Sequence, residues 1–293
     1  MKRSDFNLPF GQRLMLLFCF FLICYILTFA CAYLIGRLLA DNAPAAMRIS
    51  SLAQDIIAFI VPAVATAVLA SRRPAALLCI TKAPNMILVG LITVMTFISV
   101  PAQEAIIYWN NNIEFPESMA GFAALARQME DAAAQTMNVL IGDGSTASLI
   151  LNILVVGIGA AVAEELLFRG CFQRLLTTGG INGHLAVWIV AFCFSAMHMQ
   201  LFGFVPRMLL GAYFGYLLLW SRNLWLPVIA HALNNIMFVV TAAYQVRTGS
   251  PDALSQEPVL WSVEATAASV VRTAAVIYCI YYICHKKGLA VED

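Results

Sequence analysis

Charged residues are scarce in this chain. Only 11% of its 293 residues are Asp, Glu, Lys or Arg, whereas 61% are hydrophobic and the mean hydropathy is +0.83. Soluble domains carry about 25% charged and about 45–50% apolar residues, so the composition excludes an ordinary soluble globule. We therefore predict an all-α, polytopic membrane protein, whose principal non-protein partner is the lipid bilayer.

A strong net charge and a cysteine pattern are also missing. The formal net charge is +1, which gives no electrostatic case for a nucleic-acid partner. The eight cysteines form no CxxC pair and mostly lie in apolar runs. We interpret them as small hydrophobic residues rather than as a disulfide framework or a structural zinc site.

Two protease motifs are absent as well. The sequence contains no GxSG motif, which disfavours a serine intramembrane protease. The sequence IGDG at 141–144 has Leu140 where a GxGD motif needs glycine, which disfavours an aspartyl intramembrane protease.

Long apolar runs are abundant. A membrane-spanning helix needs about 20 largely apolar residues. We predict about eight transmembrane helices, at residues 14–36, 52–70, 85–103, 147–168, 184–200, 204–220, 225–245 and 262–284. The first run is longer than the apolar part of a cleaved signal peptide, so we interpret it as a retained helix. Neither a long internal repeat nor a low-complexity tail interrupts the pattern, and residues 1–293 are expected to form a single integral membrane domain.

The charges between these runs predict the orientation, because Lys and Arg gather on the cytoplasmic side of membrane proteins. With the N-terminus inside, the inner segments carry Lys2, Arg3, Arg13, Arg72, Arg73, Lys82, Arg169, Arg174, Arg222, Lys286 and Lys287. The outer segments carry Glu104, Glu114, Glu117, Glu130, Asp131, Asp143, Asp252 and Glu257. We therefore expect both termini in the cytoplasm and, in a bacterial host, insertion in the plasma membrane. Asp55 and Glu104 lie near the ends of predicted helices and are expected at the membrane interface.

Residues 116–139 are too polar to span. Phe122, Leu125 and Met129 recur there at helical spacing, which predicts an amphipathic helix on the membrane surface or over a cavity. A solvated connector is the alternative.

Polar side chains interrupt the apolar runs between 147 and 245. Glu164 and Glu165 are the only acidic residues between Asp143 and Asp252. Glu165 and Arg169 are four residues apart, so on a helix they share a face and can pair, whereas Glu164 points about 100° away. One carboxylate is then neutralised by its arginine and the other remains available. The simpler interpretation is that the pair marks a helix end at the interface.

Two further pairs strengthen the functional interpretation. Phe194 and His198 are four residues apart in one apolar run, and His231 and Asn235 are four apart in another. Buried polar groups without partners are costly, so we predict that these side chains meet in one cavity. A glutamate can act as general base toward water, a histidine can hold that water, and a histidine and an amide can donate to the oxyanion formed at a peptide carbonyl.

The order Glu-Glu-x-x-x-Arg, Phe-x-x-x-His and His-x-x-x-Asn resembles the CAAX protease and bacteriocin-processing family of intramembrane glutamic endopeptidases, which includes type II CAAX prenyl endopeptidases and abortive-infection proteins. Residues 147–245 would be the catalytic core, and the glycines Gly211 and Gly215 also resemble the family. The resemblance implies Glu164 as the base, His198 as its partner on the water, and His231 with Asn235 in the oxyanion hole. Glu165, Arg169 and Phe194 would shape the site. The implied substrate is a peptide or protein terminus, including lipidated ones, and no cofactor is required.

Three alternatives remain at this stage. The same residues could bind zinc in a metalloprotease, although HExxH is absent and asparagine is a poor zinc ligand. Intramembrane Glu and His residues also serve transporters and proton relays. A non-catalytic sensor or immunity partner with the same fold is the third. Arg207, which follows FGFVP, is expected to flank the mouth of the site.

Overall fold

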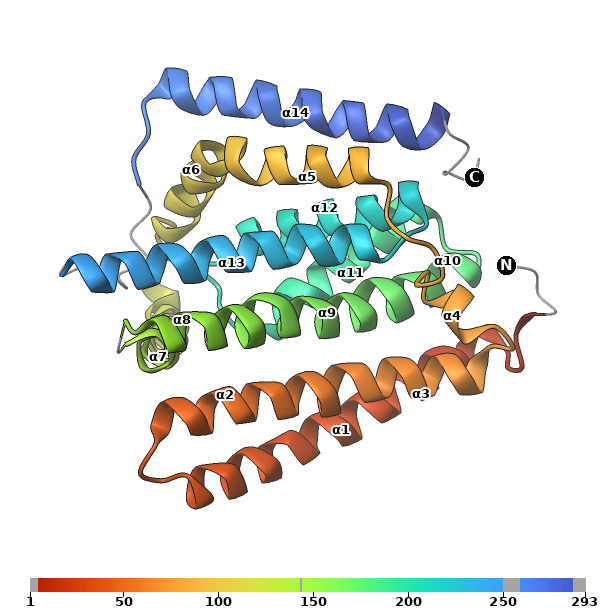
Figure 1. Ribbon diagram of the computed structural model, residues 1–293, viewed down its shortest axis with the longest axis horizontal. Helices are drawn as coiled ribbons and strands as arrows, with labels where there is room; N and C mark the ends of the chain where they lie inside the picture. Colours follow the sequence, from red (N-terminus) through yellow and green to blue (C-terminus); the bar gives the residue numbers. More distant parts are fainter. Residues whose placement is uncertain (1–4, 143, 250–258, 287–293) are drawn as a thin grey trace.

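The computed structural model describes residues 5–142, 144–249 and 259–286, and within them every regular element is a helix. The only β-type pairing in this part of the chain is an isolated bridge between Phe6 and Ser71. The predicted all-α class is therefore confirmed. Figure 1 shows the long helices lying side by side along the longest axis of the molecule, with successive long segments antiparallel.

The N-terminal half contains α1 (Phe10–Leu38), α2 (Ala43–Gln54), the π-helical segment η2 (Asp55–Ile60), α3 (Val61–Ala70) and α4 (Pro74–Leu77). It continues with α5 (Met86–Ile98), α6 (Val100–Asn111), the short 3-10 segment η3 (Glu117–Met119) and α7 (Ala120–Ile141).

The C-terminal half begins with α8 (Thr146–Asn152), η4 (Ile153–Gly159), α9 (Ala160–Glu165), η5 (Leu166–Gln173) and α10 (Arg174–Thr178), which follow one another without a break. It then forms α11 (Gly183–Met197), α12 (Phe204–Ser221), α13 (Trp225–Thr248) and α14 (Val263–Lys286).

Several of these helices are long and apolar enough to cross a membrane, so the chain is a polytopic integral membrane protein. Among the described residues, five helices qualify by length and composition, at Phe10–Leu38, Ala43–Ala70, Thr146–Thr178, Trp225–Thr248 and Val263–Lys286. A sixth is counted if α5 and α6, which are bent by 51° at a short break, form one span. The two remaining predicted spans correspond to α11, an apolar helix of 15 residues, and to α12. The total of eight spans stays a prediction.

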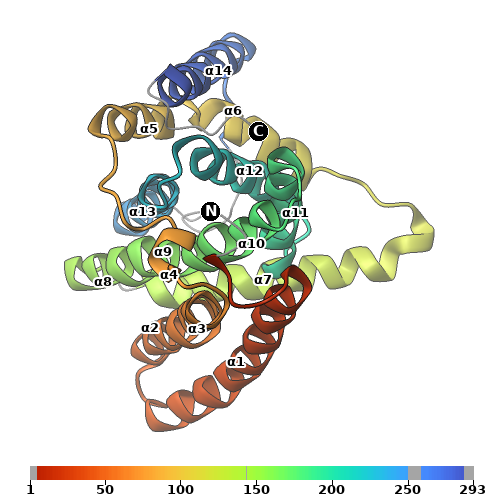
Figure 2. The same cartoon turned by 90° about the vertical axis from the view of Figure 1, so that its right-hand side faces the viewer.

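The outer helices carry the lipid-facing surface expected of such a protein. In Figures 1 and 2, α1 and α14 lie at opposite edges of the bundle. Their large side chains are turned outward: Leu22 and Ile26 of α1 are 58% and 60% exposed, and Val271 of α14 is 68% exposed. The helix α1 begins and α14 ends at the same end of the bundle, in agreement with an even number of passes (Figure 1). Which side of the membrane that end faces stays a prediction.

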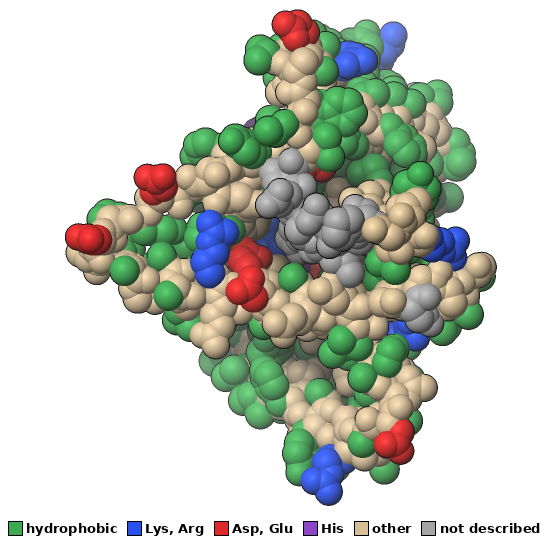
Figure 3. Space-filling view, turned by 90° about the vertical axis from the view of Figure 1, so that its left-hand side faces the viewer, with side chains coloured by type: hydrophobic (Ala, Val, Ile, Leu, Met, Phe, Trp, Pro, Cys, Tyr) green, Lys and Arg blue, Asp and Glu red, His purple; other side chains and the backbone are tan. Residues whose placement is uncertain are grey.

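The segment predicted to be amphipathic, 116–139, does form a helix. Its main element, α7, crosses one end of the bundle roughly at right angles to the long helices, as the two ribbon views together show (Figures 1 and 2). Phe122 and Leu125 are 49% and 55% exposed, so they do not pack into the bundle. Figure 3 looks onto the same end, where a few separated charged side chains lie among hydrophobic and uncharged ones. This placement suits a helix that rests at a membrane surface.

The expectation for Asp55 was wrong. The second spanning helix begins at Ala43 rather than at residue 52, so Asp55 lies near the middle of the 28-residue helix Ala43–Ala70 and is buried. The helical turns before residue 52 were not predicted from hydropathy because they contain Arg48. The hydrogen-bond donors of this arginine are satisfied locally: it donates to the Asn152 side chain at 2.9 Å and to the backbone oxygen of Leu140 at 3.0 Å.

Some charges used for the orientation lie outside the described residues, and the structure gives no account of them. They are Lys2, Arg3, Asp143, Asp252, Glu257 and Lys287.

The core places the polar motifs between two helical layers. One apolar cluster joins α1, η2 and α3 to η5 and α11, and a second joins α5, α12, α13 and α14. The helix α9 lies between them, in contact with η2 on one side and α13 on the other. Close approach of α12 requires its glycines: a β-carbon at Gly211 would meet Arg169 and Phe194 at 3.1 Å, and one at Gly215 would meet Gln173 at 3.0 Å.

Candidate active site

Glu165 is the centre of a fully buried ion-pair chain. Its Oε1 accepts a hydrogen bond from Nη1 of Arg169 at 2.8 Å and lies 2.9 Å from Nδ1 of His231. The Glu165 and Arg169 side chains have no exposed surface. The ion pair predicted from the four-residue spacing is thus present, and His231 joins it from α13. The chain links α9, η5 and α13 through one oxygen atom.

Arg169 is held on three sides. Besides Glu165, its Nη2 donates to the backbone oxygen of Gly211 at 2.9 Å. Its guanidinium carbon lies 4.4 Å from the centre of the Phe194 ring, a cation–π distance. The missing side chain of Gly211 is what admits the guanidinium to the α12 backbone. Arg169 therefore fixes the relative positions of η5, α11 and α12.

The His231 ring is clamped between aromatic side chains. It stacks on Phe214 with ring centres 4.9 Å apart and meets the edge of Phe194 at 5.8 Å. Because Nδ1 is occupied by Glu165, Nε2 is the nitrogen available to other groups. That nitrogen lies 3.9 Å from Oε2 of Glu164. Glu164 and Glu165, although adjacent, thus approach the same imidazole from different directions.

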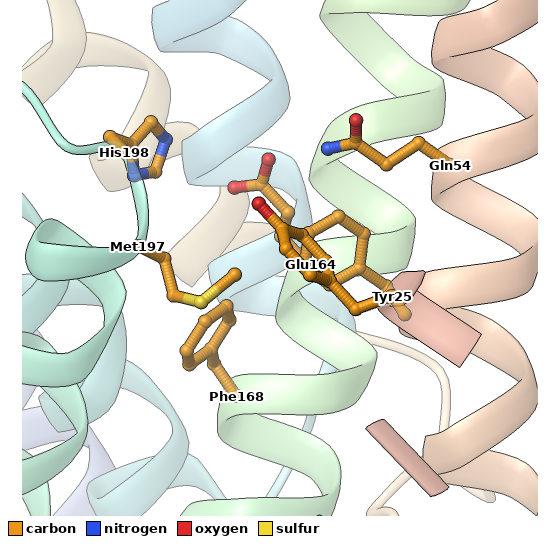
Figure 4. A pocket seen from close by; sticks show the side chains of 7 residues that line it. Tyr25, Gln54, Glu164, Phe168, Met197 and His198 are labelled. Atoms are coloured by element: carbon orange, nitrogen blue, oxygen red, sulfur yellow. The ribbon is translucent and has the colours of Figure 1, made fainter. Parts of the chain in front are cut away.

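Glu164 projects into a cavity that also receives His198. The cavity has a volume of about 240 Å³ and is lined by Tyr25, Gln54, Phe59, Glu164, Phe168, Met197 and His198. Oε2 of Glu164 is buried and accepts no hydrogen bond from any described residue. Figure 4 shows its carboxylate directed into the space between His198 and Gln54. A cavity of this size with a polar lining has room for water molecules.

His198 ends α11 and presents one nitrogen to this cavity. Its Nδ1 lies 2.8 Å from the backbone oxygen of Phe194, which can only accept, so Nδ1 carries the hydrogen. In the neutral ring Nε2 is then an acceptor. The Phe-x-x-x-His spacing therefore has a local meaning: one helical turn brings the carbonyl of Phe194 to the ring of His198 and sets its tautomer.

Asn235 lies one turn beyond His231 on α13. Its Nδ2 donates to the backbone oxygen of Val156 in η4 at 3.2 Å. In a regular α-helix, the Val156 carbonyl would accept from the N–H four residues later. In a π-helical segment the hydrogen bonds run to the N–H five residues later, so the set of donors differs. One hydrogen of the amide is engaged in this way, and the second is left for another acceptor.

Six of the seven residues singled out from the sequence are joined by contacts or share the cavity lining, whereas Asn235 contacts Val156 and does not line the cavity. Glu165, Arg169, Phe194 and His231 form the buried chain and its aromatic surround, and Glu164 and His198 face the cavity. Arg207, expected at the mouth, donates to the Gln200 side chain at 2.8 Å, which in turn donates to Glu130 of α7 at 2.8 Å. Arg207 thus ties α12 to the transverse helix.

Two polar residues beside this region, Tyr25 and Gln54, escaped the sequence analysis, and a third, Asp55, was expected at the membrane interface instead. Tyr25 and Gln54 line the cavity. Asp55 packs close to the cavity: a β-carbon added at Gly159, the residue before α9, would lie 3.3 Å from Oδ2 of Asp55. Tyr25 lies in one apolar run of the N-terminal half, and Gln54 and Asp55 are adjacent in another. Polar residues within apolar runs were the available signal, but no spacing links these residues to the later motifs.

Among the described residues there is no group of three or more His, Cys, Asp and Glu side chains arranged to hold a metal ion. The zinc alternative therefore has no ready-made ligand set of that kind in the structure.

The segment that carries these residues matches a known protein family. Residues 146–237 match the family model described as Type II CAAX prenyl endopeptidase Rce1-like. The matched segment runs from α8 through the middle of α13 and contains all seven residues. Searches among characterised proteins and among solved structures found no match.

Proposed function

We propose that this chain, an integral membrane protein whose residues 146–237 form a CAAX-protease domain, hydrolyses peptide bonds with a water molecule that Glu164 activates. Membership of the CAAX protease and bacteriocin-processing family implies an intramembrane protease. We assign Glu164, His198, His231 and Asn235 the roles that the family resemblance implies. One observation supports this assignment: Glu164 and His198 line the same cavity, and no described residue donates a hydrogen bond to the Glu164 carboxylate.

The attacking water would be held between these two groups. Glu164 accepts one of its protons, while Nε2 of His198 accepts a hydrogen bond from the other O–H and orients the oxygen. The oxygen attacks the carbonyl carbon of the scissile bond, and a C–O bond forms as the carbonyl oxygen becomes an oxyanion. Glu164 then gives its proton to the nitrogen of the leaving amine as the C–N bond breaks.

The oxyanion needs donors that are fixed before the reaction begins. Nε2 of His231 and the free N–H of Asn235 are our candidates. The buried chain of Arg169 and Glu165 holds the His231 ring in place, so that no reorganisation is needed. Both ring nitrogens of His231 must carry hydrogens in this role, because Nδ1 faces a carboxylate oxygen of Glu165 while Nε2 donates to the oxyanion.

The substrate would be a peptide or protein terminus that reaches the cavity, including lipidated ones. This choice rests on the prenyl endopeptidase family that residues 146–237 match and on the placement of the cavity among apolar helices. No cofactor is needed for the proposed steps. We further propose that both termini face the cytoplasm and, in a bacterial host, that the protein lies in the plasma membrane.

The test uses purified protein in detergent and an internally quenched peptide that ends in a farnesylated CAAX sequence, together with its unprenylated equivalent. Wild-type protein should cleave at least one of them, and Glu164→Gln should reduce cleavage to background because it keeps the shape and removes the base. Glu104→Gln, the same change in α6 outside the cavity, is the matched control and should remain active. Cleavage by Glu164→Gln at the wild-type rate would overturn the proposed role.

A further inference from the structure

Two polar groups of the N-terminal helices, the Gln54 amide and the Tyr25 hydroxyl, lie in the membrane-spanning part of the protein, where the Tyr25 ring stacks on Phe21. Gln54 lies near the middle of the 28-residue helix Ala43–Ala70, and Tyr25 lies near the middle of the 29-residue α1. Within the described chain, the Gln54 amide makes no hydrogen bond to another protein group, and neither does the Tyr25 hydroxyl. An amide in this position is costly unless it faces water or a ligand.

Both side chains point into the cavity of the candidate active site. Figure 4 shows the Gln54 amide extending from α2 toward the Glu164 carboxylate, with Tyr25 reaching the same side from α1. The opposite wall is formed by Met197 and His198 of the matched domain. The cavity is therefore completed by two helices that lie outside residues 146–237.

The chemistry of this wall matches a peptide backbone. A side-chain amide offers one acceptor and two donors. A peptide group of an extended substrate likewise offers a donor and an acceptor, and both need partners when the substrate leaves water for this cavity. The aromatic rings of Phe59 and Phe168 beside Gln54 offer no such partners.

We propose that Gln54 is a substrate-binding residue, whose amide hydrogen-bonds a peptide group of the substrate next to the scissile bond, and that Tyr25 supports the same wall. The proposal rests on the proposed proteolytic function and assigns the N-terminal helices a part in it. Gln54 does not touch the reacting atoms in this scheme. Its loss should therefore weaken substrate binding rather than stop the chemistry.

The first experiment compares Gln54→Leu with wild type on the peptide that wild type cleaves. Gln54→Leu should raise KM about two- to tenfold, the equivalent of one neutral hydrogen bond, with kcat changed less than KM. Gln103→Leu is the matched control: it makes the same change in α6, where the amide bonds Ser99 and not the cavity, and should leave KM unchanged. An unchanged KM for Gln54→Leu in protein that is folded and active would overturn the proposal.

A second experiment identifies the bond itself. Peptides are made in which one backbone N–H at a time, beside but not at the scissile bond, is replaced by an ester oxygen. At the position that Gln54 contacts, the ester should weaken wild type and have no further effect on Gln54→Leu. If the effects of the ester and of Gln54→Leu simply add at every position, Gln54 binds no backbone N–H of the substrate.

Binding is measured separately from cleavage so that the two proposals can fail independently. The fluorescent farnesylated CAAX peptide is titrated into Glu164→Gln and into the double variant with Gln54→Leu, and anisotropy is followed. Weaker binding by the double variant supports the role of Gln54 even if wild type cleaves nothing, in which case only the proposed hydrolysis fails. Equal binding by the two proteins, or no binding by either, overturns the inference.

Discussion

Glu165 and His231 are joined directly, with Oε1 of the carboxylate 2.9 Å from Nδ1 of the imidazole. The same oxygen also accepts from Arg169 at 2.8 Å. The second glutamate of the pair is therefore a buried structural anchor that holds a functional histidine, while the first is left free to face the cavity. This division between neighbouring carboxylates is the basis of the predictions that follow.

Removing the Glu165 charge should destabilise the protein. Glu165→Gln leaves the buried Arg169 guanidinium without its counter-charge, and breaking a buried pair from one side costs about 3–5 kcal/mol. The temperature at which the purified protein loses its helical circular dichroism should fall accordingly.

The double variant Glu165→Gln, Arg169→Met is the control for charge, because it removes both partners. It should recover part of the lost stability, although activity should stay low since His231 has lost its anchor. If Glu165→Gln unfolds at the wild-type temperature, the ion-pair chain is not a structural element.

His198 should matter for turnover, and the other histidine of α11 should not. His198→Ala removes the acceptor on the attacking water, and loss of such a group lowers rates by about 10²–10⁴-fold. We expect kcat on the peptide substrate to fall within that range.

His184 provides the comparison because it lies at the opposite end of α11, where its Nδ1 is 3.2 Å from the Tyr216 hydroxyl. His184→Ala should leave kcat close to that of wild type. Equal losses in the two variants would point to a general effect of altering α11 rather than to water binding.

The oxyanion role separates two neighbouring asparagines. Asn235→Ala should lower kcat about 10²–10³-fold, the range found when one oxyanion donor is removed, with little effect on KM. Asn234 is turned about 100° away on α13 and serves as the control.

If Asn234→Ala reduces kcat as much as Asn235→Ala does, the four-residue spacing from His231 has no functional meaning. A loss confined to Asn235 but accompanied by a lower unfolding temperature would instead assign it to its bond with Val156.

Chelation distinguishes the glutamate mechanism from its metal alternative. We expect dialysis against a strong zinc chelator to leave the cleavage rate unchanged, because the proposed steps use only protein groups and water. Metal content by mass spectrometry before and after dialysis verifies the treatment. If dialysis abolishes activity and added zinc restores it, the metalloprotease hypothesis would be favoured over the glutamate mechanism.

The sequence by itself determined the class of the molecule. Scarce charge and long apolar runs can be accommodated only by membrane-spanning helices, and this property is local to each segment. The pairing of Glu165 with Arg169 was likewise predictable, since four residues on one helix bring two side chains to one face. The transverse helix α7 could likewise be predicted, because its apolar residues recur at helical spacing.

Contacts between distant segments were decided only by the tertiary structure. The sequence placed His231 and Glu165 in the same region, but the packing of α13 on α9 made the imidazole meet Glu165 at Nδ1 and Glu164 at Nε2. Asp55 became a mid-membrane residue because its helix starts earlier than hydropathy suggests. Gln54 and Tyr25 reached the cavity through the docking of α1 and α2. A helix fixes which of its own residues share a face, whereas the neighbour that each face meets depends on how all the helices pack together.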